Sequence, residues 1–149
     1  GEIIIRSGKL KKPIQASKEF YEKTTDEFPI LFCIAALTKG ISVFKGIKDL
    51  ANKESNRIKE MQKILRQAGI KSFATKNEMK IYGKDYLENK NKEIKVPNLG
   101  DHRICMSSSI LSLITGIKIK IKNFETVKTS SPNFLRTIKS LGAKFEIKK

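Results

Sequence analysis

Four segments of the sequence place polar and charged residues directly before stretches whose apolar residues recur at helical spacing. These segments are 24–27 (TTDE), 53–57 (KESNR), 100–103 (GDHR) and 128–132 (KTSSP). The start of a helix presents free N–H groups and the positive end of the helix dipole, so it attracts anions. Four cations lie in these segments: Lys53, Arg57, Arg103 and Lys128. The pattern therefore predicts sites for phosphate or carboxylate groups at helix starts.

Carboxylates lie in the same segments and allow two interpretations. Asp26, Glu54 and Asp101 carry groups that can accept or donate a proton in catalysis. A carboxylate near a helix start is also favourable for the helix itself, because it caps free N–H groups and faces the positive dipole end. For each acid taken alone, capping is the commoner role.

Two further features of these segments bear on a ligand. Lys53 and Arg57 are four residues apart and would share a helix face if Lys53 lay in the first turn. An anion between the two cations would then relieve their repulsion. His102, the single histidine, stands beside Arg103 at the start of an otherwise apolar helix. Both a role in the site and a purely structural role are open for it.

The elements that position these segments are marked by a junction that recurs four times: a helix-like stretch, a glycine and a β-rich stretch. The glycines are Gly40, Gly69, Gly116 and Gly142. A glycine in this place is expected to take the left-handed conformation that ends a helix. The first and third glycines lie 76 residues apart, and the second and fourth lie 73 apart. We therefore expect a two-helix unit that occurs twice in a layered α/β fold.

The expected elements follow from these junctions. Helices are expected over 26–39, 54–68, 102–115 and 132–141, the last capped by Ser131 with Pro132 as its first residue. Strands are expected over 2–6, over 13–16 and after each junction glycine, with a hairpin formed by 71–75 and 79–82. Residues 86–98 are expected to form a loop that contains a short strand.

The composition narrows the classes of function. The chain has 149 residues and a formal net charge of +16, which attracts anions in general. Only five of its 31 cations are arginine, tryptophan is absent and the lysines are scattered, so a base-reading surface for nucleic acid is not favoured. No apolar run approaches the roughly 18 residues of a membrane span. Cys33 and Cys105 lie in apolar patterns and are expected to be buried thiols rather than zinc ligands.

Four motifs in one order resemble a known enzyme family. They are DEFPIL (26–31), KESNR (53–57), GDHRICM (100–106) and VKTSSPNF (127–134). Over about residues 2–146 the chain is similar to the C-terminal part of the 5-enolpyruvylshikimate-3-phosphate synthase (3-phosphoshikimate 1-carboxyvinyltransferase) family. The resemblance implies an α/β (α+β) fold of repeated βαβαββ units, a partial inside-out barrel of the enolpyruvyl transferase type. Residues 1–149 would form its C-terminal portion: 1–20 the end of one unit, 21–98 the next unit and 99–149 the last.

The resemblance also implies a reaction. The enolpyruvyl group of phosphoenolpyruvate would pass to the 5-hydroxyl of shikimate 3-phosphate through a tetrahedral intermediate, with release of phosphate and without a metal or other cofactor. Asp26 matches the carboxylate that takes the proton from the attacking hydroxyl. Glu54 matches an acid that protonates the methylene carbon, a role for which Lys128 is the alternative. His102 matches a histidine that positions groups in the same pocket.

The same resemblance indicates which residues would hold the two substrates. Shikimate 3-phosphate would be bound by Asp26, Asp49 and Lys53. Phosphoenolpyruvate carries both a carboxylate and a phosphate, so it needs several cations, and arginine can bind either group with two parallel hydrogen bonds. The matching cations are Arg57, Arg103 and Lys128.

The resemblance and the alternatives to it predict different partners for the chain. A missing N-terminal half of the same enzyme would supply the opposite wall of a cleft, so the chain is expected to be an inactive fragment on its own. The protein is expected to be cytoplasmic, with no nucleic-acid or membrane partner. The alternatives are a non-catalytic basic module that binds nucleic acid, and a relative of the UDP-N-acetylglucosamine enolpyruvyl transferases, which share the fold but lack the KESNR- and DHR-type motifs. A decayed remnant without function is also open.

Overall fold

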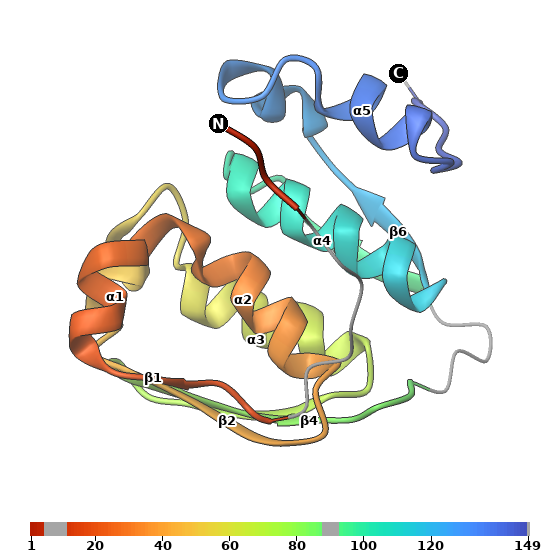
Figure 1. The fold of residues 1–149 in the computed structure, drawn as a ribbon. Helices are drawn as coiled ribbons and strands as arrows, with labels where there is room; N and C mark the ends of the chain where they lie inside the picture. The colour runs from red at the N-terminus through yellow and green to blue at the C-terminus, as the bar shows by residue number, and fades with distance from the viewer. Residues whose placement is uncertain (5–11, 88–92, 149) are drawn as a thin grey trace.

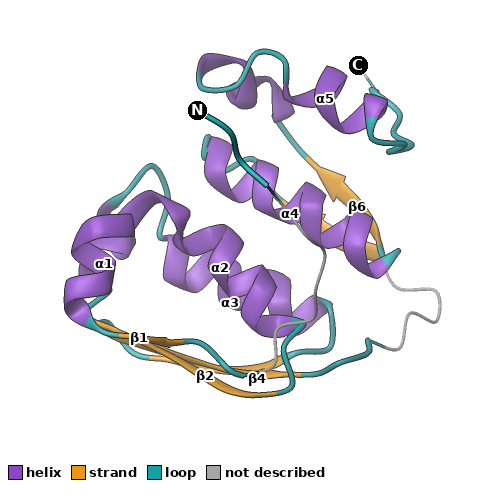
Figure 2. Cartoon of the chain, in the orientation of Figure 1, coloured by secondary structure: helices purple, strands orange, loops and turns teal. Residues whose placement is uncertain are grey.

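The computed structural model of the chain describes residues 1–4, 12–87 and 93–148, and their fold is mixed α/β, as the sequence predicts (Figures 1 and 2). The first layer is a four-stranded sheet whose strands, in spatial order, are β1 (Gln15–Ala16), β2 (Gly40–Lys45), β4 (Glu78–Gly83) and β3 (Lys71–Ala74). Helices α2 (Phe28–Ala36) and α3 (Arg57–Gln67) cover one face of this sheet. Helix α4 (His102–Thr115) packs on α2 and α3 on their far side (Figure 1).

The strand order places the predicted hairpin at one edge of the sheet. Strand β1 runs parallel to β2, whereas β2 and β3 both run antiparallel to β4. The β3–β4 hairpin turns at Thr75, whose Oγ1 accepts hydrogen bonds from the backbone N–H groups of Asn77 (3.2 Å) and Glu78 (3.0 Å). The division of the chain into units at residues 20 and 98 stays a prediction. Strand β1 lies before residue 20 and belongs to the same sheet as β2, β3 and β4.

The first expected helix, 26–39, is wrong in its bounds. A separate helix, α1 (Lys18–Thr24), precedes it and is capped by the side chain of Ser17. A 3₁₀ turn, η1 (Thr25–Glu27), then leads into α2. The α-helical hydrogen bonding starts only there, because Pro29 has no N–H to donate and fits the first turn of a helix.

The second and third expected helices differ in how well they are predicted. Helix α3 starts three residues later than the expected 54–68, because the Asn56 side chain caps it by accepting a hydrogen bond from the Lys59 N–H at 3.0 Å. Helix α4 has the expected bounds, from its cap by Asp101 to Gly116, which ends it in the left-handed conformation with φ of 69°. All four junction glycines have positive φ. Gly69, Gly116 and Gly142 follow the end of a helix as predicted, whereas Gly40, with φ of 116°, is the first residue of β2 and does not end α2.

A smaller region follows α4. It contains a two-stranded parallel sheet of β5 (Glu93–Val96) and β6 (Lys118–Ile121), the 3₁₀ segment η3 (Phe124–Thr129) and helix α5 (Phe134–Ser140). Strand β5 confirms the short strand expected within 86–98. Helix α5 is shorter than the expected 132–141: Ser131 does not cap it and Pro132 lies outside it, because the chain first makes a turn in which the Ser131 carbonyl accepts from the Phe134 N–H.

Two expected strands are absent from the described part of the chain. Residues 2–4 and 143–148 form no strand, and residues 5 and 6 lie outside the described residues. A strand is stable only beside a hydrogen-bonded neighbour, and none of the described strands pairs with 143–148. The local β propensity of residues 143–148 is therefore not enough to form a strand.

Aromatic side chains fix the start of α2 against the sheet. Phe28, Phe32 and Phe44 are fully buried and contact one another edge to face, with ring centroids 4.9 to 5.8 Å apart. The apolar core around them continues to α3, α4 and β5. Because Asp26 and Glu27 directly precede Phe28, this packing sets the place of both carboxylates.

Two smaller predictions concern the cysteines and membrane spans. Cys33 and Cys105 are buried free thiols, as the sequence predicts. Burial raises the pKa of the Cys33 thiol to about 12 and that of Cys105 to about 11. Among the helices of the described residues, none combines the length and apolar character of a membrane span.

Candidate active site

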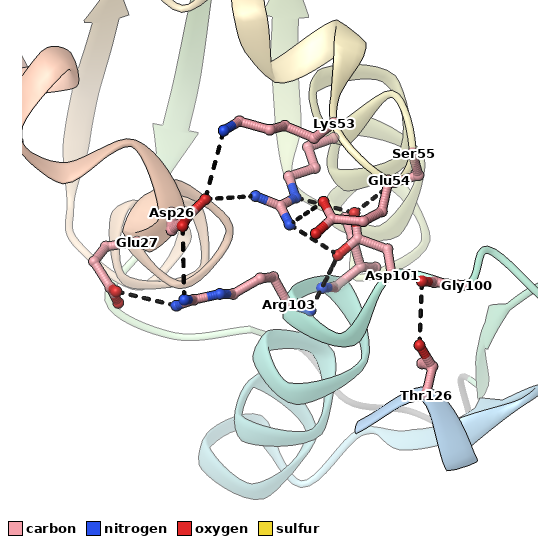
Figure 3. Close-up of polar contacts among 11 residues, drawn as sticks. Asp26, Glu27, Lys53, Glu54, Ser55, Gly100, Asp101, Arg103 and Thr126 are labelled. Carbon is pink, nitrogen blue, oxygen red and sulfur yellow. Dashed lines mark hydrogen bonds and ion pairs between the residues drawn. The ribbon is translucent and has the colours of Figure 1, made fainter. Parts of the chain in front are cut away.

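Arg57 is the centre of a cluster of charged residues that come from separate segments of the chain. Its partners Asp26, Glu54 and Asp101 are labelled in Figure 3. Its Nε donates to Asp101 Oδ2 at 3.0 Å, its Nη1 to Asp26 Oδ1 at 3.2 Å and its Nη2 to Glu54 Oε2 at 2.6 Å. The side chain is only 1% exposed. Three carboxylates thus surround one buried guanidinium, and their charges and hydrogen bonds offset its desolvation.

Asp101 is the fully buried member of this cluster. Its carboxylate caps α4 by accepting hydrogen bonds from the backbone N–H groups of Arg103 (3.0 Å) and Ile104 (3.2 Å). Ser55 Oγ donates to Oδ2 of the same group at 2.9 Å. Burial alone would raise the pKa of Asp101, but the hydrogen bonds from Arg57 and Ser55 outweigh burial and lower the pKa below its ordinary value.

Asp26 stands at the mouth of the cluster, with its side chain 50% exposed. Besides Arg57, its carboxylate lies 3.7 Å from Lys53 Nζ and 3.8 Å from Arg103 Nη2. Burial would raise the pKa of Asp26, but the hydrogen bond from Arg57 and the positive charges of Lys53 and Arg103 lower it. The carboxylate is therefore ionised at neutral pH and still open to a ligand.

A groove beside this cluster runs between the start of α2 and the start of α4. Its volume is about 160 Å³, and it is lined by Asp26, Glu27, Ile30, Arg103, Met106, Ser107 and Ile110. Arg103 is 28% exposed there and is paired with Glu27 Oε1 at 3.1 Å. A larger groove of about 380 Å³ lies between α3 and the β3–β4 turn, but its lining contains none of the clustered residues. The smaller groove is the one that places an acid and a cation together.

The structure brings together five of the predicted site residues and leaves three outside their direct contacts. The five are Asp26, Lys53, Glu54, Arg57 and Arg103. Among the described residues, none forms a hydrogen bond or ion pair that ties the other three to this cluster; they are Asp49, His102 and Lys128. His102 is the first residue of α4, next to the Asp101 cap.

Lys128 and Asp49 differ in how far their elements lie from the cluster. Lys128 belongs to η3, which packs on α4 and is tied to its start by a hydrogen bond from Thr126 Oγ1 to the Gly100 carbonyl at 3.1 Å (Figure 3). The Lys128 side chain is exposed. Asp49 is exposed within the 3₁₀ segment η2 (Lys48–Asn52).

The condition for Lys53 and Arg57 to share a helix face, that Lys53 lies in the first turn, is not met. Lys53 precedes α3 with extended backbone (φ −83°, ψ −163°), because α3 starts at Arg57. Their repulsion is relieved by the Asp26 carboxylate, which lies between the two cations. The hydrogen bond between Asp101 and Arg57 was not predicted, and neither was the hydrogen bond from Ser55 to Asp101. The signal available in the sequence was an acid at a helix start in a motif that also carries an arginine.

Comparisons with known proteins identify relatives of the chain. A family model described as EPSP synthase (3-phosphoshikimate 1-carboxyvinyltransferase) matches residues 2–138. The 3-phosphoshikimate 1-carboxyvinyltransferase of Geotalea daltonii is 35% identical over 133 residues, which cover 89% of this chain and 30% of that protein. The enzyme of the same name from Bacillus subtilis is 33% identical over 144 residues, covering 97% of this chain and 33% of that protein.

A solved structure extends the likeness to three dimensions. The structure of EPSP synthase from Acinetobacter baumannii superposes with a TM-score of 0.81 and 33% sequence identity, over 93% of this chain and 32% of that one. The chain spans about a third of the length of the relatives it matches. The ordered motifs, the shared fold and the match over most of the chain lead to one conclusion: the chain belongs to the EPSP synthase family.

Proposed function

We propose that the protein to which this chain contributes transfers the enolpyruvyl group of phosphoenolpyruvate to the 5-hydroxyl of shikimate 3-phosphate and releases phosphate. The relatives carry the name of that enzyme. The observation that carries the proposal is that Asp26 lies 3.2 to 3.8 Å from the cationic groups of Lys53, Arg57 and Arg103. The same names favour this enzyme over the UDP-N-acetylglucosamine enolpyruvyl transferases.

Asp26 suits the role of general base. A base must be ionised at the working pH and must reach the hydroxyl that it deprotonates. The lowered pKa of Asp26 satisfies the first condition, and its half-exposed side chain at the edge of the groove satisfies the second. The neighbouring cations would also hold the anionic groups of the substrates beside this carboxylate.

Arg103 and Arg57 would hold phosphoenolpyruvate, but they are not equally accessible. Arg103 faces the groove and is ready to contact an anion. Arg57 is 1% exposed, so a ligand reaches it only when one of its half-exposed partners, Glu54 or Asp26, withdraws. Glu54 is the better candidate, because it lies on the segment before α3 and contacts only Nη2 of Arg57. Lys128 would close over the ligand from η3.

The remaining roles follow from the family resemblance. Lys53 and Asp49 would contact shikimate 3-phosphate, and His102 would position groups in the pocket. Either Glu54 or Lys128 would protonate the methylene carbon. No cofactor is required, and the missing N-terminal half of the enzyme would supply the opposite wall. A cytoplasmic location without nucleic-acid or membrane partners remains part of the proposal.

Phosphate release by the complete protein, with both substrates present, tests the function. We expect Asp26→Ala to lower kcat by about 10²- to 10⁴-fold and to change the KM of either substrate far less. Asp85→Ala is the matched control, because Asp85 is an exposed acid outside the cluster. Unchanged turnover in Asp26→Ala would remove Asp26 as the base, and absence of turnover in the unmodified complete protein would overturn the function. For the nucleic-acid alternative, tight DNA binding with a steep salt dependence at physiological salt would be required.

A further inference from the structure

One carboxylate that lines the groove between α2 and α4 has no part in the proposed reaction. This residue is Glu27, whose side chain is 57% exposed. It stands at the N-cap position of α2, yet its side chain accepts no capping hydrogen bond from that helix. Its Oε1 instead accepts a hydrogen bond from Arg103 Nη1 at 3.1 Å, from a residue 76 positions further along the chain (Figure 3). A role at the start of α2 therefore does not explain this side chain.

Glu27 and Asp26 both contact Arg103, but Asp26 has more partners. Asp26 lies 3.8 Å from Arg103 Nη2 and also contacts Arg57 and Lys53. In the part of the chain that the structure describes, the Glu27 carboxylate forms its hydrogen bond and ion pair with Arg103 alone. A half-exposed side chain with one partner can turn into solvent by changing rotamer. Glu27 is therefore the partner that Arg103 loses most easily.

We propose that Glu27 competes with the anionic substrate for Arg103 and thereby sets the affinity of the site for phosphoenolpyruvate. This inference rests on the proposed function, since it takes phosphoenolpyruvate as the ligand of Arg103. A bound anion would be the third negative group around this guanidinium, beside the carboxylates of Asp26 and Glu27. Because like charges repel and Nη1 is already occupied, Glu27 has to withdraw before the anion can bind there.

A role in which Glu27 only holds Arg103 in place predicts the opposite effect on binding. Loss of such a support would loosen the arginine and weaken the binding of the ligand. Arg103 has other supports, because its backbone N–H donates to Asp101 Oδ1 at 3.0 Å and its side chain also lies beside Asp26. Competition instead predicts tighter binding when the carboxylate is removed. The sign of the change thus separates the two roles.

Glu27→Gln in the complete protein tests the competition, with Glu22→Gln as the matched control. The Glu22 side chain is 58% exposed and pairs with Lys18 on α1 at 3.5 Å, so its substitution makes the same change in net charge outside the cluster. With shikimate 3-phosphate saturating, we expect Glu27→Gln to lower the KM of phosphoenolpyruvate about two- to fivefold, the range that an exposed ion pair supports. Glu22→Gln should leave this KM unchanged. An unchanged or higher KM in Glu27→Gln would overturn the competition.

The same substitution in an Arg103→Ala protein tests whether Glu27 acts through this arginine. Without the guanidinium there is no group for which Glu27 and the anion compete, so Glu27→Gln should no longer lower the KM of phosphoenolpyruvate. A decrease of the same size in the absence of Arg103 would show a general effect of charge and would overturn the proposal.

A failure of the proposed function is distinguishable from a failure of this inference. Absence of turnover in the unmodified complete protein would overturn the function, whereas calorimetric titration with inorganic phosphate and with oxalate would still measure the competition. We expect at least one of these anions to bind about two- to fivefold more tightly to Glu27→Gln than to Glu22→Gln. Equal affinities of the two variants for both anions would overturn the inference.

Discussion

Replacing Arg57 with methionine removes the charge at the centre of the cluster and keeps much of the side-chain volume. Arg57 is 1% exposed and its partner Asp101 is 0% exposed, so Arg57→Met leaves a buried carboxylate without its cation. Breaking a buried pair in this way typically costs about 3–5 kcal/mol. This is a large part of the roughly 5–15 kcal/mol that stabilises an ordinary domain.

Urea unfolding at neutral pH measures this loss against a matched control. The pair between Lys63 and Glu60 has the same i,i+3 spacing as the pair between Arg57 and Glu54 and a distance of 2.8 Å, but the Lys63 side chain is 53% exposed. We expect Lys63→Met to lower the free energy of unfolding by about 1 kcal/mol or less. A loss in Arg57→Met that is no larger than in Lys63→Met would refute the reasoning that burial makes the Arg57 contacts costly to break.

The pH dependence supplies a second check of the same reasoning. The folded pKa of Asp101 is lowered, so its stabilisation is present above the unfolded value of about 3.9 and is lost as the pH falls through the lower folded pKa. In Arg57→Met, burial without a cation should instead raise the pKa of Asp101. Lowering the pH toward 4 then protonates the buried carboxylate, which removes the cost of burying its charge. The stability difference between the two proteins should therefore narrow as the pH falls from 7 to 4. A constant or growing difference would contradict the assignment.

Two further predictions concern the scaffold. Cys33 and Cys105 should not react with a thiol reagent at pH 8 in the folded chain, because burial raises their pKa values to about 12 and 11, and both should react after unfolding in urea; rapid reaction of the folded chain would contradict their burial. Gly83→Ala should lower the free energy of unfolding by about 1–3 kcal/mol or more, because the added Cβ would overlap the backbone carbonyl oxygens of Ala35 and Thr38. Unchanged urea unfolding in Gly83→Ala would show that this contact between β4 and the end of α2 is not close.

The sequence predicts elements well where both ends carry a local signal. Helix α4 has a capping acid at one end and a left-handed glycine at the other, and its bounds are correct. The expected helix 26–39 has no such cap, and its true start depends on where Pro29 and the buried Phe28 pack. The strand expected at 143–147 fails for a similar reason, because pairing with a neighbour, and not local propensity, decides whether a strand forms.

In the site, too, the identities of the residues were predictable from the sequence, whereas their long-range contacts were not. That Asp26, Arg57 and Arg103 would share one pocket was implied by the family resemblance, and the structure places them together. That Arg57 is buried and encircled by carboxylates was not predicted, because its partners lie 3, 31 and 44 residues away along the chain. Only the packing of α4 against α2 and α3 brings the Asp101 carboxylate to Arg57.

A crystal structure of the complete protein with phosphoenolpyruvate and shikimate 3-phosphate tests the account most directly. The account predicts phosphoenolpyruvate at the groove between α2 and α4, with its anionic groups on Arg103 and Arg57, Glu54 withdrawn from Arg57 and Asp26 facing the 5-hydroxyl. Phosphoenolpyruvate bound instead in the larger groove beside Lys59 and Lys76, or Arg57 still enclosed by all three carboxylates in the occupied site, would contradict it.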